Sequence, residues 1–269
     1  MNRSYLGALL LALPLCTSAI AQTAPQYALV DLGETDYSGQ GMIWADRGLT
    51  FISPDWKWPT LAPCTPGNQN TYTTPQFLNN SLIVSLGKSC TKTGEHAVMW
   101  TYSPESPIAL TDIGVLPGAL ADQSGASGSN EVGDVVGASA TAFTSSNGTP
   151  AFHAFLWNSG RFTDLGSIAG NTHNSTAVAV NSSHEVLGTT ETISSVDGTL
   201  LTRVFVYTGG KMYNLSFYTV GGLTALLTGA KWIDCQGNIS ATGFPVNKPG
   251  LQHSYLLVRQ GPARTCTDY

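Results

Sequence analysis

The stretch HAFLWNSGRFTDL, residues 153–165, decides the fold because it recurs along the chain. Residues 203–215 read RVFVYTGGKMYNL and align with it over thirteen positions without a gap. Its opening returns as HAVMW at residues 96–100 and as HSYLL at residues 253–257. Successive copies therefore begin 57, 50 and 50 residues apart. A fixed period of this length indicates a repeat architecture.

A second motif alternates with the first one. An apolar or glycine-rich segment ends in Asn or Asp and leads to a second short apolar segment. Its copies are 125–130 with 134–137, 177–181 with 185–188, and 230–234 with 238–241. Each unit thus carries four short apolar segments separated by Gly, Asn, Asp and Ser, which are strand and turn signals. Four strands in about 50 residues are typical of one propeller blade.

These repeats predict an all-β protein, a five-bladed β-propeller in which the small-residue segments form the innermost strands. Weaker copies of the second motif, at residues 42–53 and 77–87, extend the pattern toward the N-terminus. By its motif, the first strand of the chain, 27–33, corresponds to the fourth strand of a blade, and no other strand of that blade precedes it. The last strand, 253–259, corresponds to the third strand of a blade. We expect these two strands to pair and to close the ring, which removes an open sheet edge.

The first 21 residues have the pattern of a secretory signal peptide. Arg3 precedes an apolar run over residues 6–15, and Ala-Ile-Ala at 19–21 is a small-x-small cleavage site. We therefore expect a single domain over residues 22–269 that is secreted or periplasmic after cleavage near Ala21. No later stretch is long and apolar enough to predict a membrane span.

The composition is poor in charge. Only 11% of the residues are charged, with 17 acids against 12 bases, whereas soluble domains average about 25%. This balance provides no excess of basic residues with which to bind nucleic acid or an anionic membrane. We expect a monomer with an uncharged, turn-rich surface.

Four cysteines follow the predicted signal peptide, an even number that suggests two disulfides in an exported chain. The predicted strand order places Cys235 and Cys266 on one face of the propeller. It places Cys64 and Cys90 on the other face. We therefore predict the pairs Cys64–Cys90 and Cys235–Cys266.

In combination, the phrases HAFLW, TDLG and A-x-A-x-N followed by V-x-G resemble the extracellular HAF-repeat family. The resemblance covers nearly all of residues 22–269 and is strongest over 96–243. It implies an exported repeat protein and no defined activity. Residues 54–74 depart from the pattern, because WKW at 56–58 stands where a HAF strand is expected. The first repeat is therefore irregular.

The sequence contains no nucleophile elbow, zinc-protease, P-loop or dinucleotide-binding motif. His96, His153 and His253 share one repeat position, and we expect them to hydrogen-bond a neighbouring strand or turn. Asp31, Asp112 and Asp164 share another, where aspartates usually bond local backbone N–H groups. We expect no cofactor and no metal.

The candidate ligand-binding residues lie in the connections that lead into the innermost strands, around the expected channel mouth. They are Asp36, Tyr37, Asp122, Gln123, His173 and Asn174. They favour a binding or interaction module, with neutral carbohydrate or another envelope or extracellular protein as its partner. One alternative is a polysaccharide hydrolase or lyase that uses acids such as Asp36 and Asp122. Another is a structural envelope or surface protein. Without a catalytic constellation, the pattern favours a role other than that of an enzyme.

Overall fold

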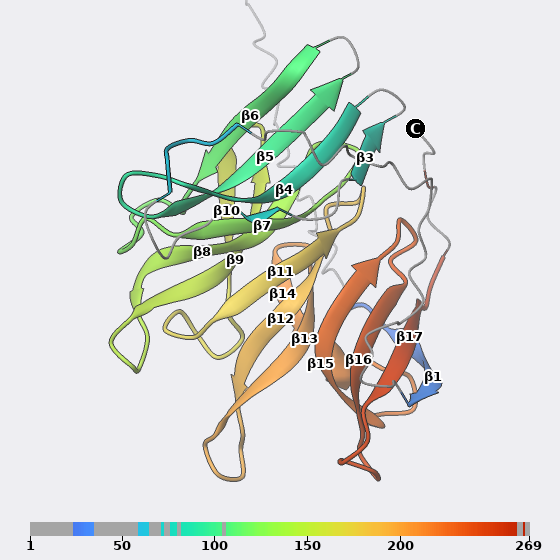
Figure 1. Ribbon diagram of the computed structural model, residues 1–269. Helices are drawn as coiled ribbons and strands as arrows, with labels where there is room; N and C mark the ends of the chain where they lie inside the picture. The colour runs from blue at the N-terminus through green and yellow to red at the C-terminus, as the bar shows by residue number, and fades with distance from the viewer. Residues whose placement is uncertain are drawn as a thin grey trace, which may run out of the picture.

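A computed structural model describes residues 24–34, 59–64, 71–72, 76–79, 82–103, 106–262 and 266. Within these residues the protein is all-β, with four sheets of antiparallel strands and one 3-10 turn at Leu215–Phe217 (Figure 1). A search of the same residues for a helix of sufficient length and apolarity to cross a membrane finds none.

The strands of each sheet are consecutive in the chain, except for β1 in the fourth sheet. The first sheet contains β2 (Thr71–Tyr72), β3 (Gln76–Asn79), β4 (Leu82–Cys90), β5 (Glu95–Ser103) and β6 (Ser106–Gly114). The second contains β7 (Ser124–Ser129), β8 (Val135–Thr144), β9 (Pro150–Asn158) and β10 (Arg161–Gly166). The third contains β11 (Ser175–Val180), β12 (Val186–Ile193), β13 (Leu200–Thr208) and β14 (Lys211–Asn214). The fourth contains β15 (Ala225–Ile233), β16 (Ile239–Pro245), β17 (His253–Arg259) and β1 (Tyr27–Glu34).

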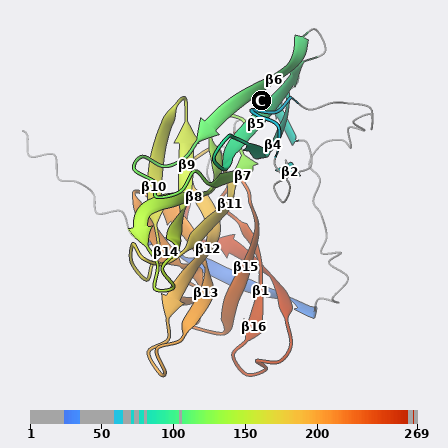
Figure 2. The ribbon, with the colours of Figure 1, turned by 60° about the vertical axis from the view of Figure 1, so that its left-hand side comes forward.

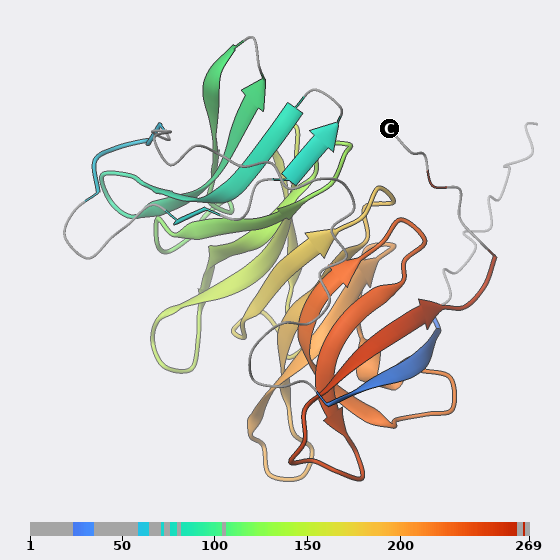
Figure 3. The same cartoon turned by 45° about the vertical axis from the view of Figure 1, so that its right-hand side comes forward.

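The two ends of the described chain meet in the fourth sheet. Strand β1 pairs antiparallel with β17, from Tyr27 opposite Arg259 to Asp31 opposite Tyr255 (Figure 3). The N-terminal strand thus serves as the outer strand of a sheet whose other strands come from the C-terminal part of the chain. The predicted pairing of the first and last strands is confirmed.

The four sheets follow one another in chain order, each packed on the next (Figures 1 and 2). Their first strands approach closely, which explains the small residues in them. A Cβ atom at Gly128 in β7 would lie 2.5 Å from the carbonyl oxygen of Val178 in β11. The Ser127 hydroxyl donates to the carbonyl of Ala177 across the same junction, at 2.7 Å.

A ladder of asparagines links the turns that follow the first strands. Asn130 donates from Nδ2 to the carbonyl of Asn181 at 2.8 Å. Asn181 donates in turn to the carbonyl of Asp234 at 2.9 Å. The next position is an aspartate, whose ionised side chain has no N–H to donate. There the disulfide Cys235–Cys266 ties the turn to the C-terminal segment.

Three apolar cores fill the spaces between consecutive sheets. Each contains one aromatic side chain from a third strand that packs toward the preceding sheet. These residues are Phe155 in the first core, Phe205 in the second and Tyr255 in the third. They occupy equivalent repeat positions, two residues after His153, Arg203 and His253.

Both predicted disulfides, Cys64–Cys90 and Cys235–Cys266, are present. The four sheets account for four of the five predicted repeats. The other repeat falls on the segment between β1 and β2, most of which lies outside the described residues, as does the predicted signal peptide. The described residues establish four antiparallel sheets and do not show a closed ring.

Candidate functional site

The repeated histidines and aspartates hold the third strand of a sheet to its fourth strand. The Nδ1 atom lies 2.9 Å from a carboxylate oxygen in the pair His96–Asp112, 2.8 Å in His153–Asp164 and 2.7 Å in His253–Asp31. Asp164 also accepts from the backbone N–H of Gly166. The repeated residues therefore stabilise the scaffold, as their repetition predicts.

Repeated serines connect consecutive sheets. The Ser124 hydroxyl accepts from the N–H of Ala97 and donates to the carbonyl of Gly114. Ser175 does the same one repeat later, with Ala154 and Gly166. Most of the sequence signature is thus accounted for by packing one sheet on the next, and a functional site has to be sought among the residues that do not repeat.

The side chain of Asp122, a predicted ligand-binding residue, is engaged by other side chains of the protein. Its carboxylate accepts hydrogen bonds from the hydroxyls of Thr91 and Thr93 and lies 2.5 Å from Nε2 of His96. The hydrogen bond from Thr93, with those from Thr91 and His96, lowers the pKa of Asp122 to about 2 although burial opposes the shift. The backbone carbonyl of the neighbouring Gln123 accepts from the N–H of Ala140.

His96 lies between two carboxylates, because Asp112 contacts Nδ1 and Asp122 contacts Nε2. A neutral imidazole has only one N–H, whereas the cation donates from both nitrogens. Burial lowers the pKa of His96, but the hydrogen bonds and charges of Asp122 and Asp112 outweigh it, so this pKa is raised above its ordinary value. Through the contact between His96 and Asp122, the cluster joins the first sheet to the connection that follows it.

The other predicted residues behave in a similar way. Asn174 accepts from the N–H of Phe152 at 2.9 Å and donates from its amide nitrogen to Glu191 at 3.0 Å. His173 has one side-chain contact in the described structure, with the hydroxyl of Thr172 at 3.3 Å. Asp122 and Gln123 lie in one connection and His173 and Asn174 in the next, while Asp36 and Tyr37 lie outside the described residues.

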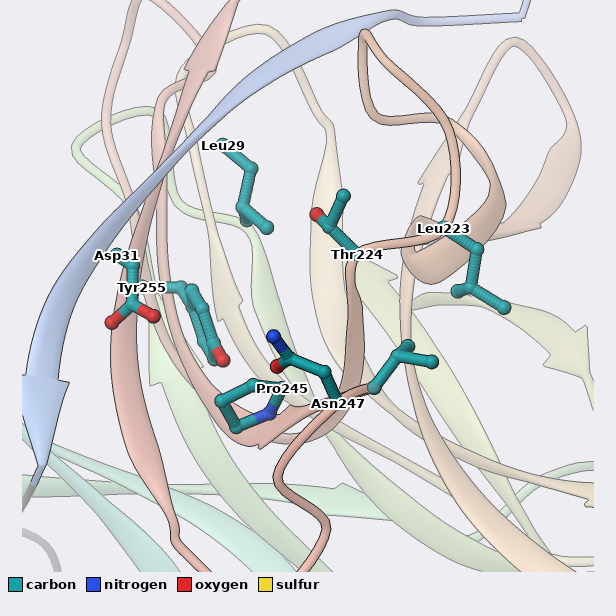
Figure 4. A pocket seen from close by; sticks show the side chains of 8 residues that line it. Leu29, Asp31, Leu223, Thr224, Pro245, Asn247 and Tyr255 are labelled. Atoms are coloured by element: carbon teal, nitrogen blue, oxygen red, sulfur yellow. The ribbon is translucent and has the colours of Figure 1, made fainter.

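A cavity of about 430 Å³ lies in the fourth sheet, at the end where β1 and β16 finish and β15 and β17 begin (Figure 4). Its apolar lining is Leu29, Leu223, Pro245 and Val246. Its polar lining is Asp31, Thr224, Asn247 and Tyr255. None of these eight residues was singled out by the sequence as ligand-binding, although Asp31 belongs to the repeated aspartates.

Tyr255 is the unusual member of the lining. Its repeat equivalents are Val98, Phe155 and Phe205, which carry no hydroxyl. Its side chain belongs to the third apolar core and is only 1% exposed, and its hydroxyl has no hydrogen-bond partner among the residues that the structure describes. Burial, together with the negative charge of Asp31, raises the pKa of Tyr255 to about 12. The hydroxyl is therefore a neutral donor at all physiological pH values.

Asp31 and His253 support the same wall of the cavity. Both Asp31 oxygens lie 2.7 Å from Nδ1 of His253, and the imidazole stacks on the Tyr255 ring with centroids 6.2 Å apart. Asn247 adds an amide from the end of β16, as Figure 4 shows. A bound molecule would meet one phenol, one carboxylate, one amide and an apolar wall.

This lining favours binding over glycoside hydrolysis. Hydrolysis of a glycosidic bond needs two carboxyl groups about 5–10 Å apart, and among the described residues Asp31 is the one carboxylate that lines the cavity. No group of three or more His, Cys, Asp or Glu side chains suited to a metal ion occurs in the part of the chain that the structure describes. Comparison with protein-family models, with curated proteins and with solved structures finds no match to this chain.

Proposed function

We propose that this protein is an exported β-propeller of the HAF-repeat type that binds a neutral carbohydrate in the cavity of its fourth sheet. The observation that carries the proposal is the Tyr255 hydroxyl at the cavity wall, which is buried and finds no partner within the described part of the chain. An unsatisfied buried hydroxyl costs about 1–3 kcal/mol. A ligand that accepts a hydrogen bond from it would recover that cost.

The rest of the lining matches the chemistry of a sugar. Ligand pockets usually have volumes of roughly 300–1,000 Å³ and combine apolar walls with a few polar groups. The Asp31 carboxylate and the Asn247 amide suit sugar hydroxyls, while Leu29 and Pro245 offer an apolar surface to the C–H face of a ring. The lining contains no basic residue, which argues against an anionic ligand.

The five-bladed ring is part of the same proposal. Pairing of β1 with β17 supports closure, because the fourth sheet is completed only when the two ends of the chain meet. The fifth blade would come from the segment between β1 and β2. Export is supported by the two disulfides, which are consistent with an oxidising, extracellular environment.

The test is a glycan array followed by titration calorimetry on the best neutral glycan. We expect Tyr255→Phe to weaken binding by about tenfold, the effect of one lost hydrogen bond. Tyr207→Phe is the matched control, since Tyr207 is a half-buried tyrosine of β13 away from the cavity. Equal affinity of wild type and Tyr255→Phe, or no binding to any neutral glycan, would reject the proposal and favour the structural role.

A further inference from the structure

We propose that one end of the molecule docks on the surface of a neutral lipid bilayer. We call this end the loop face and define it as residues 91–94, 115–123, 143–150, 167–174, 193–200, 215–224 and 246–252. It contains the connections between sheets and the hairpins between second and third strands. In an antiparallel four-stranded sheet these segments lie at the same end, and the hairpins β8–β9, β12–β13 and β16–β17 all point toward the lower side of Figure 1.

The loop face holds most of the exposed apolar side chains. Of the fourteen large hydrophobic residues that are exposed in the described structure, eleven lie on it. The other three are Val30, Val132 and Trp232. Val196, at the tip of the β12–β13 hairpin, is 93% exposed. An apolar concentration at one end of a charge-poor protein marks an interaction surface.

The charges on this face exclude an electrostatic partner. The loop face contains four charged residues, Lys92, Asp122, Asp197 and Lys248. Asp122 is engaged with Thr91, Thr93 and His96. Binding to anionic lipids depends on clusters of four or more Lys and Arg, and two lysines in the hairpins of different sheets do not form one. The face therefore fits zwitterionic headgroups.

The residue types favour a lipid over a protein partner. Hot spots of protein interfaces are enriched in Trp, Tyr and Arg and poor in Leu, Val, Ser and Thr. The loop face has no Trp, no Arg and one tyrosine, Tyr218, and it consists mainly of aliphatic, hydroxyl and glycine residues. Aliphatic side chains at hairpin tips bind a bilayer through the apolar area that they bury in it.

The hairpin tips can enter the interfacial region without leaving many backbone groups unpaired. Strands β12 and β13 stay paired out to Ile193 opposite Leu200. Beyond them, the N–H of Ser194 bonds to the carbonyl of Thr199, and the N–H of Val196 to the Ser194 hydroxyl. Unpaired backbone groups are costly in hydrocarbon, so this internal pairing favours insertion. The nearby Asp197 limits the depth to the headgroup boundary.

The test is flotation of the purified full chain with phosphatidylcholine vesicles at low and high salt. We expect wild type to partition to the vesicles equally at both salt concentrations. Val196→Ser should reduce partitioning by about tenfold, the effect of one fully buried valine. Val132→Ser is the matched control, because Val132 is an exposed valine in the β7–β8 turn at the opposite end, and it should partition like wild type.

A second variant reports on insertion directly. The fluorescence of the tryptophan introduced by Val196→Trp is measured as the difference between the emission spectra of the variant and of wild type. On addition of vesicles its emission maximum should shift to shorter wavelength, and brominated phosphatidylcholine should quench it. Failure of wild type to partition, equal partitioning of Val196→Ser, binding only to anionic vesicles, or an unshifted difference spectrum of Val196→Trp would each overturn the proposal. The cavity lining shares Leu223, Thr224, Val246 and Asn247 with the loop face, whereas Tyr255 lies in β17 outside it. Tyr255→Phe should therefore weaken glycan binding but partition like wild type, which distinguishes failure of this proposal from failure of the proposed function.

Discussion

Replacing Tyr255 with phenylalanine is expected to raise the free energy of unfolding of the unliganded protein. Burying a tyrosine normally gains a hydrogen bond, and its removal costs about 1 kcal/mol. The Tyr255 hydroxyl forms no such bond with any described residue, and phenylalanine fills the equivalent position in β9 and β13 as Phe155 and Phe205. The substitution removes the penalty of an unsatisfied group without a change of shape, so we expect a gain of about 1–2 kcal/mol.

The measurement is urea unfolding with the disulfides intact. Two probes should give coincident transitions, which justifies a two-state treatment. Tyr255→Phe should raise the midpoint at an unchanged slope, and its melting temperature should rise by roughly 2–6 °C for a domain of this size. Saturating glycan should cancel most of this difference, since a tenfold loss of affinity costs the variant about 1.4 kcal/mol of ligand stabilisation relative to wild type.

Alkaline pH provides an independent check on the same side chain. Because the pKa of Tyr255 is raised to about 12 in the folded protein, ionisation occurs first in the unfolded chain. The contribution of Tyr255 is therefore fully present below pH 10 and is lost as pH rises toward 12. The phenylalanine variant should lose less stability over that range. A destabilisation of about 1 kcal/mol or more by Tyr255→Phe at neutral pH would show that the hydroxyl is bonded and would refute the reasoning.

Two further substitutions test the contacts between sheets. Arg259→Met should lower the free energy of unfolding by about 3–5 kcal/mol in urea, because it leaves the buried carboxylate of Glu185, 2.6 Å away, without its cation. Adding Glu185→Gln to this variant should restore part of the loss. A cost below about 1 kcal/mol would mean that the ion pair is not desolvated. In wild type, the part of the stability that depends on ionised Asp122 should be present above pH 4 and lost as pH falls toward 2, because the pKa of Asp122 is lowered to about 2. Asp122→Asn should weaken the fall of the melting temperature between pH 4 and pH 2, with Glu131→Gln as the control. An unchanged pH dependence in Asp122→Asn would count against the interaction of Asp122 with His96.

The scaffold could be predicted from the sequence because its signals are periodic. The repeat of about 50 residues sets the strand order within a sheet, and the phase of the repeat at Tyr27 and Arg259 predicts the pairing of β1 with β17. The same phase sorts the connections onto two faces, which is sufficient to pair the four cysteines. Periodic positions share one environment, so each copy supports the interpretation of the others.

The candidate site could not be predicted in this way. Asp122 and Asn174 stand in connections where they suggest ligand binding, but Thr91, Thr93 and Phe152, which come from distant positions in the chain, already satisfy them. Sequence separation conceals such partners. A comparison of the repeats at the position of Tyr255 would have given a signal, because a hydroxyl replaces an apolar side chain at one copy of a buried position.

The fourth sheet departs from the repeat in several respects, and the departures occur together. Asp234 ends the asparagine ladder that Asn130 and Asn181 form. The outer strand β1 comes from the other end of the chain, and Tyr255 carries a hydroxyl that its equivalents lack. A packed repeat tolerates a buried unsatisfied group only at a cost. Three copies without this hydroxyl show that the scaffold does not require it, so its presence beside the cavity of the fourth sheet supports the proposal that a ligand binds there.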